Sequence, residues 1–327
     1  MKKILTQLTA GGTLSKEEAK KVMLDIGHAD FKPAELASFL TVFLMRPVTV
    51  DEFYGFREAL LEMSLSVDLG TTEAIDIVGT GGDGKNTFNI STVSCFVVAG
   101  AGYKVIKHGN YASSSVSGSS NVLEMLGYRF SNEPGLLKKQ LEEANLTFLH
   151  APLFHPALKS VAPVRRELGL RTIFNMLGPV VNPARPKHQL LGVYHADAGK
   201  LYSAMLTKAG VNHTIVHSTD GYDEISLTAD FDLFINGEHQ TVSPEEIGFE
   251  LIKAEEIYGG DTIQKAAKIF TDVLEGKASP AQTNVVLANS AYAIMTISGK
   301  SYEESLQQAK DSLLGGKALK TFKKLIG

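Results

Sequence analysis

The residues best suited to chemistry lie in a glycine-rich stretch, residues 76–92, which reads D-I-V-G-T-G-G-D-G-K-N-T-F-N-I-S-T. Small residues between a strand and a helix allow backbone N–H groups to approach an anion closely, and a helix beginning at Ser91 or Thr92 would add its dipole. A simple tight turn is the alternative interpretation. The flanking strand and helix signals favour a phosphate-binding loop.

The spacing within this stretch excludes two common nucleotide-binding motifs. No Gly-Lys-Ser/Thr follows at the distance of a P-loop, and the glycines do not form the G-x-G-x-x-G dinucleotide pattern. The pattern therefore argues against an ATPase and against a dehydrogenase.

A second candidate loop is residues 107–121, K-H-G-N-Y-A-S-S-S-V-S-G-S-S-N. It also follows a predicted strand, and it offers Lys107, the amide of Asn110 and six serines as donors to phosphate oxygens. Serine-rich loops are commonly just solvent-facing turns. Two such loops after neighbouring strands make a single, larger oxyanion site the stronger hypothesis.

An acidic turn, D-G-Y-D-E at residues 220–224, follows a third predicted strand. Asp223 and Glu224 supply hard oxygen ligands, and Mg²⁺ in proteins prefers one or two carboxylates together with substrate phosphates. An exposed acidic turn is the alternative. The two phosphate-binding candidates favour the magnesium interpretation.

Two arginines, Arg165 and Arg166, lie in the predicted helical segment 155–172. Such side chains usually face solvent, but one turned inward could bind a substrate carboxylate with two parallel hydrogen bonds. The residues alone do not decide between Arg165 and Arg166.

The elements that must position these residues fall into two patterns. The first sixty-odd residues predict helices only, with capping signals at Ser15 and Thr49 and a proline, Pro33, in a first turn. From residue 74, short β-rich segments alternate with helical ones, which predicts a mostly parallel sheet covered by helices. The predicted strands are 74–78, 103–107, 147–150, 189–194, 214–217 and 232–235, and the predicted helices are 91–99, 121–126, 136–143, 156–168 and 200–209, with more helix over 260–299.

Composition narrows the class of protein. The 327 residues are 44% hydrophobic and 21% charged, with a net charge of −4, as expected of a globular chain and not of a nucleic-acid binder with a basic stripe. The single cysteine, Cys95, lies in an apolar segment and allows no disulfide framework. No apolar stretch approaches the ~20 residues of a membrane span, so we expect a cytoplasmic protein without a membrane or nucleic-acid partner.

Taken together, the motifs resemble those of the anthranilate phosphoribosyltransferase family, in the same order and at the same spacing over essentially the whole chain. They are G-T-G-G-D-G, T-F-N-I-S-T, K-H-G-N, H-P-A-x-K, A-P-V-R-R-E-L-G-x-R-T, F-N-x-L-G-P, N-P and D-G-x-D-E-I. The resemblance implies a small N-terminal helical domain beside a larger α/β domain, the nucleoside-phosphorylase-like phosphoribosyltransferase fold, and a homodimer. It places the helical domain at residues 1–70, joined by part of 165–188, and the α/β domain at 71–327.

The resemblance also implies roles for individual residues, with Mg²⁺ as the cofactor. Anthranilate would contact Gly79, Asn110 and Arg165. Magnesium would bind Ser91, Asp223 and Glu224. Phosphoribosyl pyrophosphate would bind the largest set, which comprises Gly79, Gly82, Asp83, Thr87, Asn89, Ile90, Ser91, Thr92, Lys107, His108, Gly109, Asn110, Tyr111, Ala112, Ser113, Ser114, Ser115 and Ser119.

The chain departs from the family pattern inside the second loop. Tyr111, Val116 and Asn121 stand where many members have arginine, lysine and aspartate. Two cations and one anion are lost together, which indicates a compensated variant and weakens the expectation of direct phosphate contacts from Tyr111 and Val116.

The implied reaction is attack of the neutral aromatic amine of anthranilate on ribose carbon 1 as pyrophosphate leaves. Positioning and electrostatics would drive it, so we expect no catalytic base and no covalent intermediate. The sequence leaves two alternative functions open. One is a pyrimidine nucleoside phosphorylase, which has a related fold and glycine loop, and the other is a non-catalytic nucleic-acid-binding relative of the same fold.

Overall fold

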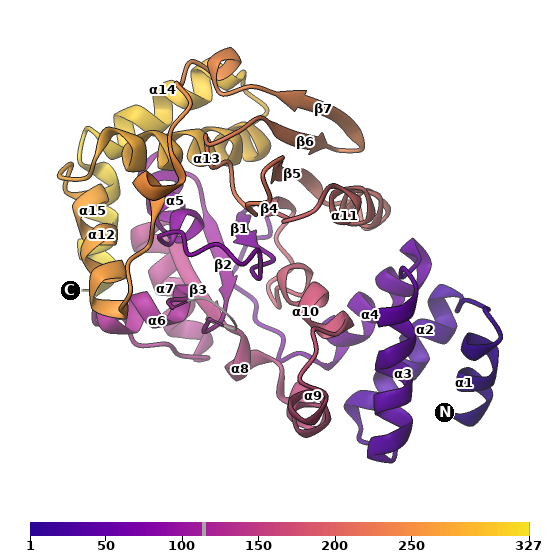
Figure 1. Cartoon of the computed structure of the whole chain (residues 1–327). Coiled ribbons are helices and arrows are strands. Elements are labelled where there is room, and N and C mark those ends of the chain that lie inside the picture. The colour runs from indigo at the N-terminus through magenta and orange to yellow at the C-terminus, as the bar shows by residue number, and fades with distance from the viewer. Residues whose placement is uncertain (113–115, 327) are drawn as a thin grey trace. The chain divides into compact units, whose positions relative to one another are not determined.

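The computed structural model describes residues 1–112 and 116–326, which form two compact units (Figure 1). The first unit combines Met1–Val67 with Ala151–Pro183, and the second combines Asp68–His150 with Ala184–Gly327. Within the described residues, no helix is both long enough and apolar enough to cross a membrane.

The first unit is entirely helical. Side-chain caps at Ser15 and Thr49, each paired with a glutamate three residues later, and Pro33 in a first turn confirm the predicted helix starts. The helices are α1 (Lys2–Thr9), α2 (Lys16–Gly27), α3 (Pro33–Met45), α4 (Val50–Met63), α8 (Ala151–Phe154), α9 (Ala162–Leu168) and α10 (Ile173–Leu177), with 3₁₀ turns η1 (Pro156–Lys159) and η2 (Gly178–Val180).

Aromatic packing and one buried carboxylate hold α2, α3 and α4 together. Phe39, Phe43 and Phe56 contact one another edge to face, with ring centroids 5.1 to 5.9 Å apart. Glu52 is fully buried and accepts hydrogen bonds from the backbone of Leu14 and from Arg46. The start of α2 and the end of α3 are thereby tied to α4.

The second unit contains a seven-stranded sheet in the order β3-β2-β1-β4-β5-β6-β7. Strands β1 to β5 pair in parallel, and β6 and β7 add antiparallel strands at one edge, so the predicted mostly parallel sheet is confirmed. The strands are β1 (Ile75–Gly79), β2 (Val105–Gly109), β3 (Leu146–His150), β4 (His188–Gly192), β5 (Asn212–Ser218), β6 (Phe231–Ile235) and β7 (Glu238–Val242).

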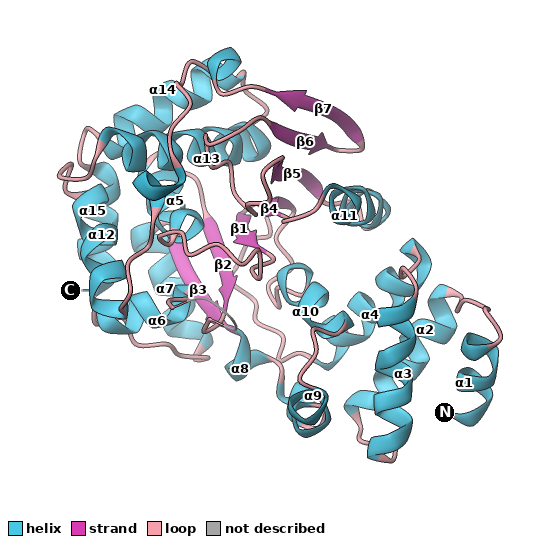
Figure 2. Ribbon diagram, in the orientation of Figure 1, coloured by secondary structure: helices cyan, strands magenta, loops and turns pink. Residues whose placement is uncertain are grey.

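Helices cover both faces of this sheet (Figure 2). Right-handed crossovers from β1 to β2 and from β4 to β5 run in opposite directions along the sheet, which puts α5 and α11 on opposite faces. Helix α13 packs against α5 and against β4. The helices of this unit are α5 (Ile90–Gly100), α6 (Ser119–Met125), α7 (Pro134–Ala144), α11 (Ala196–Lys208), α12 (Ile263–Leu274), α13 (Pro280–Ser298), α14 (Tyr302–Leu313) and α15 (Lys317–Ile326), with 3₁₀ turns η3 (Glu245–Ile247) and η4 (Ala254–Ile257).

One local prediction was wrong, and β7, α14 and α15 were not predicted. The single helix predicted over 156–168 is a 3₁₀ turn, η1, followed by α9, because the chain turns at Ser160 before a new helix begins at Ala162, with Pro163 in its first turn. Strand β7 was missed: four of its five residues are exposed, so it lacks the apolar alternation by which strands are detected.

Candidate active site at the carboxyl ends of β1 and β4

The candidate site lies between β1 and β4, where the order in which the chain adds strands to the sheet changes direction. From β1 the chain continues to β2 on one side, while β4, its other neighbour, leads to β5 on the opposite side. Gly79 and Gly192 end these strands in register with each other. Ligands of open α/β sheets bind at such switch points, outside the carboxyl ends of the strands.

Asp223 lies directly over both terminal glycines. A Cβ atom on Gly192 would stand 1.7 Å from the backbone oxygen of Asp223, and one on Gly79 would stand 2.4 Å from its Oδ2 atom. A larger residue at Gly192 would displace the backbone of the acidic turn, and one at Gly79 would displace the Asp223 carboxylate. Gly79 therefore accounts for the close approach of the turn to the strand end, and Gly192 is a site residue that lies in none of the sequence motifs.

The glycine loop folds over the same carboxylate. The backbone N–H of Gly81 donates to Asp223 Oδ2 at 2.6 Å, and the side chains of Asp83 and Asp223 share a hydrogen bond. Gly81 and Gly82 have φ angles of 66° and 73°, a region that residues with side chains rarely adopt. The loop thus needs glycine at these positions to reach the acidic turn.

Glu224 contacts the first turn of α5. The backbone N–H of Ser91 donates to Glu224 Oε1 at 3.2 Å, and the Ser91 hydroxyl also bonds this carboxylate. Lys107, nearly fully buried, contributes a favourable charge to Glu224 and donates to the backbone oxygen of Ile77. The structure therefore brings together all three predicted magnesium ligands, Ser91, Asp223 and Glu224, with Lys107 beside them.

The carboxyl groups of this site have pKa values above their usual range. Burial, reinforced by neighbouring negative charge, raises the pKa of Asp223 to about 7 and that of Glu224 to about 8, and burial also raises the pKa of Asp83. A bound cation would favour their charged forms. Carboxylates are hard oxygen donors, and Mg²⁺ binds through one or two of them together with substrate phosphates, so these residues fit a magnesium ion.

The site is not a cage made of protein ligands alone. Among residues 1–112 and 116–326, no three histidine, cysteine, aspartate or glutamate side chains form a group that could hold a metal ion. Mg²⁺ commonly binds through one or two carboxylates and completes its shell with water and substrate phosphates. The arrangement of Asp223 and Glu224 fits that mode of binding.

The far end of the glycine loop is fastened to the segment that follows η4. Thr87 forms an isolated antiparallel bridge with Tyr258, and Asn86 donates to the backbone oxygen of Gly260 at 2.8 Å. Ile90 and Thr92, predicted ligands, have side chains buried in the core, so only their backbone groups could contact a ligand. No sequence motif predicts this contact between residues 257–260 and the glycine loop.

The second loop joins the first through an amide. Asn89 Nδ2 donates to the backbone oxygen of Ser117 at 3.0 Å, and the Ser119 hydroxyl donates to the backbone oxygen of Asn110. A Cβ atom on Gly109 would lie 2.5 Å from Ser119 Oγ, so a larger residue where β2 ends would require the Ser119 hydroxyl to move. His108 is buried, and its backbone N–H donates to Asp76 Oδ1 at 3.2 Å.

The residues that depart from the family pattern have structural partners. Asn121 Oδ1 accepts hydrogen bonds from the backbone N–H groups of Ala112 and Gly118, at 2.9 and 3.0 Å. The Tyr111 hydroxyl donates to Glu124 Oε1 at 2.8 Å. The predicted ligands Ser113, Ser114 and Ser115 lie outside the described residues.

Arg165 belongs to the helical unit, where neighbours in the F-N-x-L-G-P motif position it. Its Nη2 atom donates to Asn175 Oδ1 at 3.3 Å, and its guanidinium lies 5.4 Å from the centre of the Phe174 ring. Burial lowers the pKa of Arg165, whereas Arg166 is exposed. Of the two arginines, Arg165 therefore has the environment of a binding residue.

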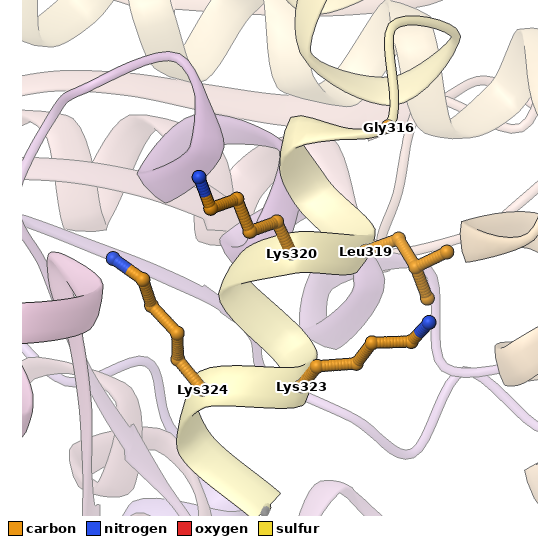
Figure 3. Close-up of a pocket in the computed structure, with 5 residues that line it drawn as sticks. All are labelled: Gly316, Leu319, Lys320, Lys323 and Lys324. Atoms are coloured by element: carbon orange, nitrogen blue, oxygen red, sulfur yellow. The ribbon is translucent and has the colours of Figure 1, made fainter.

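A separate pocket opens on α15, at the surface of the second unit (Figure 3). None of the predicted site residues lines it. Its lining consists of Gly316, Leu319, Lys320, Lys323 and Lys324, and Lys324 already donates to the backbone oxygen of Glu143.

The fold and this site define a class of enzyme: a glycosyl transferase with a helical bundle and an α/β domain. Residues 2–64 match the glycosyl transferase family's helical bundle domain, and residues 71–319 match its a/b domain. Within that class, the chain belongs to the anthranilate phosphoribosyltransferase family.

Individual relatives support this membership. The chain is 55% identical over 327 residues to the anthranilate phosphoribosyltransferase of Cytophaga hutchinsonii, with all of both chains covered, and 51% identical over 325 residues to that of Flavobacterium johnsoniae, covering 99% and 98%. The Thermus thermophilus enzyme superposes with a TM-score of 0.93 at 31% identity over 98% of each chain. The Saccharomyces cerevisiae enzyme, solved in complex with PRPP and Mg, gives a TM-score of 0.90 at 28% identity, covering 98% and 95%.

Proposed function

We propose that this protein transfers the phosphoribosyl group of phosphoribosyl pyrophosphate to the amine of anthranilate, releasing pyrophosphate, as a step of tryptophan biosynthesis. The observation that carries the proposal is the acidic turn at Asp223 and Glu224, packed on Gly79 and Gly192 beneath the glycine loop. Membership in the family supports it, and the comparisons favour neither a pyrimidine nucleoside phosphorylase nor a nucleic-acid-binding relative.

The two loops bind the diphosphate in this proposal. Backbone N–H groups of the glycine loop and the start of α5 donate to phosphate oxygens, and Lys107 and Asn110 add donors from the second loop. Asp223, Glu224 and Ser91 would hold Mg²⁺, and a bound metal would supply positive charge beside the leaving pyrophosphate. The carbon–oxygen bond to pyrophosphate breaks as the carbon–nitrogen bond forms, and the amine proton passes to water.

Arg165 binds the carboxylate of anthranilate in this proposal. Asn175 and Phe174 fix its guanidinium, so little conformational entropy is lost when it forms paired hydrogen bonds with the substrate. The amine of anthranilate is largely unprotonated near neutral pH, and no side chain is assigned as a general base.

The direct test follows the loss of anthranilate fluorescence after addition of phosphoribosyl pyrophosphate, with Mg²⁺ and with a chelator. We expect turnover that depends on the metal. Release of free base from thymidine or uridine with inorganic phosphate, without anthranilate turnover, would support the phosphorylase instead.

Arg165→Ala tests the anthranilate assignment. Loss of a charge-assisted contact with the carboxylate should raise the apparent Michaelis constant for anthranilate about 10-fold to 100-fold. The control is Arg166→Ala, which removes an exposed arginine next to it on α9. Unchanged anthranilate kinetics in the Arg165 variant would contradict the assignment.

The proposal includes a homodimer and a cytoplasmic location. Leu44 and Met45 at the end of α3 are exposed by 41% and 83%, as expected of apolar residues available to a subunit interface. The single cysteine, Cys95, is a buried free thiol, so the chain forms no internal disulfide, as is usual in a reducing compartment. Light scattering of the wild type and of Met45→Lys tests the dimer.

A further inference from the structure

Asn289 is a fully buried amide in the middle of α13, the longest helix of the described chain. Its neighbours in the sequence are V-V-L-A before it and S-A-Y-A after it. An amide in such surroundings costs free energy unless it is hydrogen-bonded. The buried side chain of Asn289 therefore requires hydrogen-bond partners within the protein.

Three hydrogen bonds fix this amide, and two of them involve the backbone of one residue. Asn289 Oδ1 accepts from the N–H of Ile225 at 3.1 Å, and Nδ2 donates at 2.9 Å to the backbone oxygens of Ile225 and of Val285. The two carbonyl groups require the NH₂ group on one side, so the orientation of the amide is determined. Ile225 is thus held at both its donor and its acceptor.

Ile225 directly follows the acidic pair, and its neighbours are also held. Ser218 Oγ donates to the backbone oxygen of Glu224 at 2.7 Å and accepts from the N–H of Ser226 at 3.1 Å. Three successive backbone positions after Asp223 are therefore fixed by buried side chains. Asn289, which lies on α13 and 64 residues away in the sequence, holds the backbone of Ile225.

We propose that Asn289 is a positioning residue for the magnesium–diphosphate site: by pairing with the backbone of Ile225, it holds Asp223 and Glu224 where they bind the metal. The inference rests on the proposed function. Residues that orient metal ligands through hydrogen bonds typically change metal affinity about 10-fold to 100-fold when they are mutated.

A purely structural role predicts a different result, and the same helix offers a matched control. Thr296 is also buried on α13, and its hydroxyl donates to Thr214 Oγ1 at 2.7 Å, a contact with β5 remote from the acidic pair. Thr296→Val removes a buried hydrogen bond from the same helix. It should lower stability without changing metal-dependent binding.

The experiment is calorimetric titration of pyrophosphate into the full-length protein, with Mg²⁺ and with a chelator. In Asn289→Ala and Asn289→Leu we expect the dissociation constant with Mg²⁺ to rise about 10-fold or more. In Thr296→Val it should equal that of the wild type. The apparent Michaelis constant for anthranilate should stay unchanged in all three variants.

Folded Asn289 variants that bind magnesium pyrophosphate as tightly as the wild type would overturn the inference, as would an equal loss in Thr296→Val. If neither Asn289 variant folds, Ser218→Ala releases the same peptide from its other side, and unchanged binding there overturns the inference. A wild type that does not bind magnesium pyrophosphate would instead refute the proposed function, and the role of Asn289 with it.

Discussion

Both units of the molecule bury carboxylates, but the pKa values of these groups are shifted in opposite directions in the two units. In the helical unit, burial pushes the pKa of Glu52 upward, but Arg46 and the backbone N–H groups of Thr49 and Leu14 outweigh it, and the pKa lies below its usual value. In the α/β unit, burial and mutual repulsion raise the pKa of Asp223 and Glu224.

This difference separates a structural carboxylate from a candidate binding site. Glu52 has a counter-charge within the protein and joins three helices. Asp223 and Glu224 lack comparable compensation and lie at the carboxyl ends of β1 and β4, where a ligand can supply the missing positive charge. The following variants test the comparison.

Arg46→Met should have the largest effect on stability. It removes the counter-charge of Glu52, which is fully buried, and should lower the free energy of unfolding by about 3 kcal/mol, the lower end of the range for broken buried pairs because Arg46 is partly exposed. Urea unfolding followed by circular dichroism measures this loss.

The control for Arg46 is an exposed pair in the same unit. Lys21 lies 2.8 Å from Asp25 on the surface of α2, and Lys21→Met should cost about 0.5 kcal/mol or less. Equal losses in the two variants would mean that the buried pair has no special role.

Glu224→Gln, in contrast to Arg46→Met, should lower activity and leave stability unchanged. It keeps the size of the side chain and removes a carboxyl group whose charged form is disfavoured by burial and by Asp223, so stability should not fall, whereas kcat/KM for phosphoribosyl pyrophosphate should fall about 100-fold or more. Steady-state kinetics over a range of Mg²⁺ concentrations measures the effect. A variant that keeps wild-type magnesium dependence would show that Glu224 is not a ligand.

His155 extends the comparison to a buried base in the helical unit. Burial lowers its pKa to about 4, only partly opposed by a hydrogen bond with the backbone of Val181. Because the unfolded chain takes up the proton first, near pH 6.5, stability is complete above that pH and falls toward pH 4, by about 2 kcal/mol at pH 5.

The check is urea unfolding at pH 7.5 and pH 5 in the wild type and in His155→Asn. The loss of stability between the two pH values should be smaller in the variant. An identical loss would show that His155 does not contribute to acid sensitivity.

Tyr111→Phe should have the smallest effect. It removes the hydroxyl that bonds Glu124 from a partly exposed side chain, and should raise the Michaelis constant for phosphoribosyl pyrophosphate about two- to threefold by loosening the second loop. Tyr103→Phe, which removes a hydroxyl bonded to Gln308, is the control. A larger effect would indicate that Tyr111 contacts the substrate directly.

Local signals in the sequence predicted much of the fold. The helix starts at Ser15, Pro33 and Thr49 depend on neighbouring residues only, and the structure confirms them. The apolar strands β1 to β6 were found for the same reason. The exposed edge strand β7 carries no such signal, and the strand order depends on long-range pairing that no local pattern encodes.

In the site, too, local patterns predict some residues, while others depend on long-range contacts. The acidic pair and the glycine loop stand out by residue type and spacing, and the structure brings them together. Gly192 acts through its contact with Asp223, and Asn289 through its contacts with Ile225, so both depend on residues that lie far away along the chain. The only sequence signal for Asn289 is an amide within an apolar helix, which does not name its partner.

The most direct test of the account is a crystal structure with Mn²⁺ in place of Mg²⁺ and with pyrophosphate bound, in which anomalous scattering locates the metal. We predict a metal peak coordinated by Glu224 and Asp223, with the pyrophosphate against the glycine loop that begins at Gly79. A metal and diphosphate bound at another surface, with the acidic turn unliganded, would contradict the account.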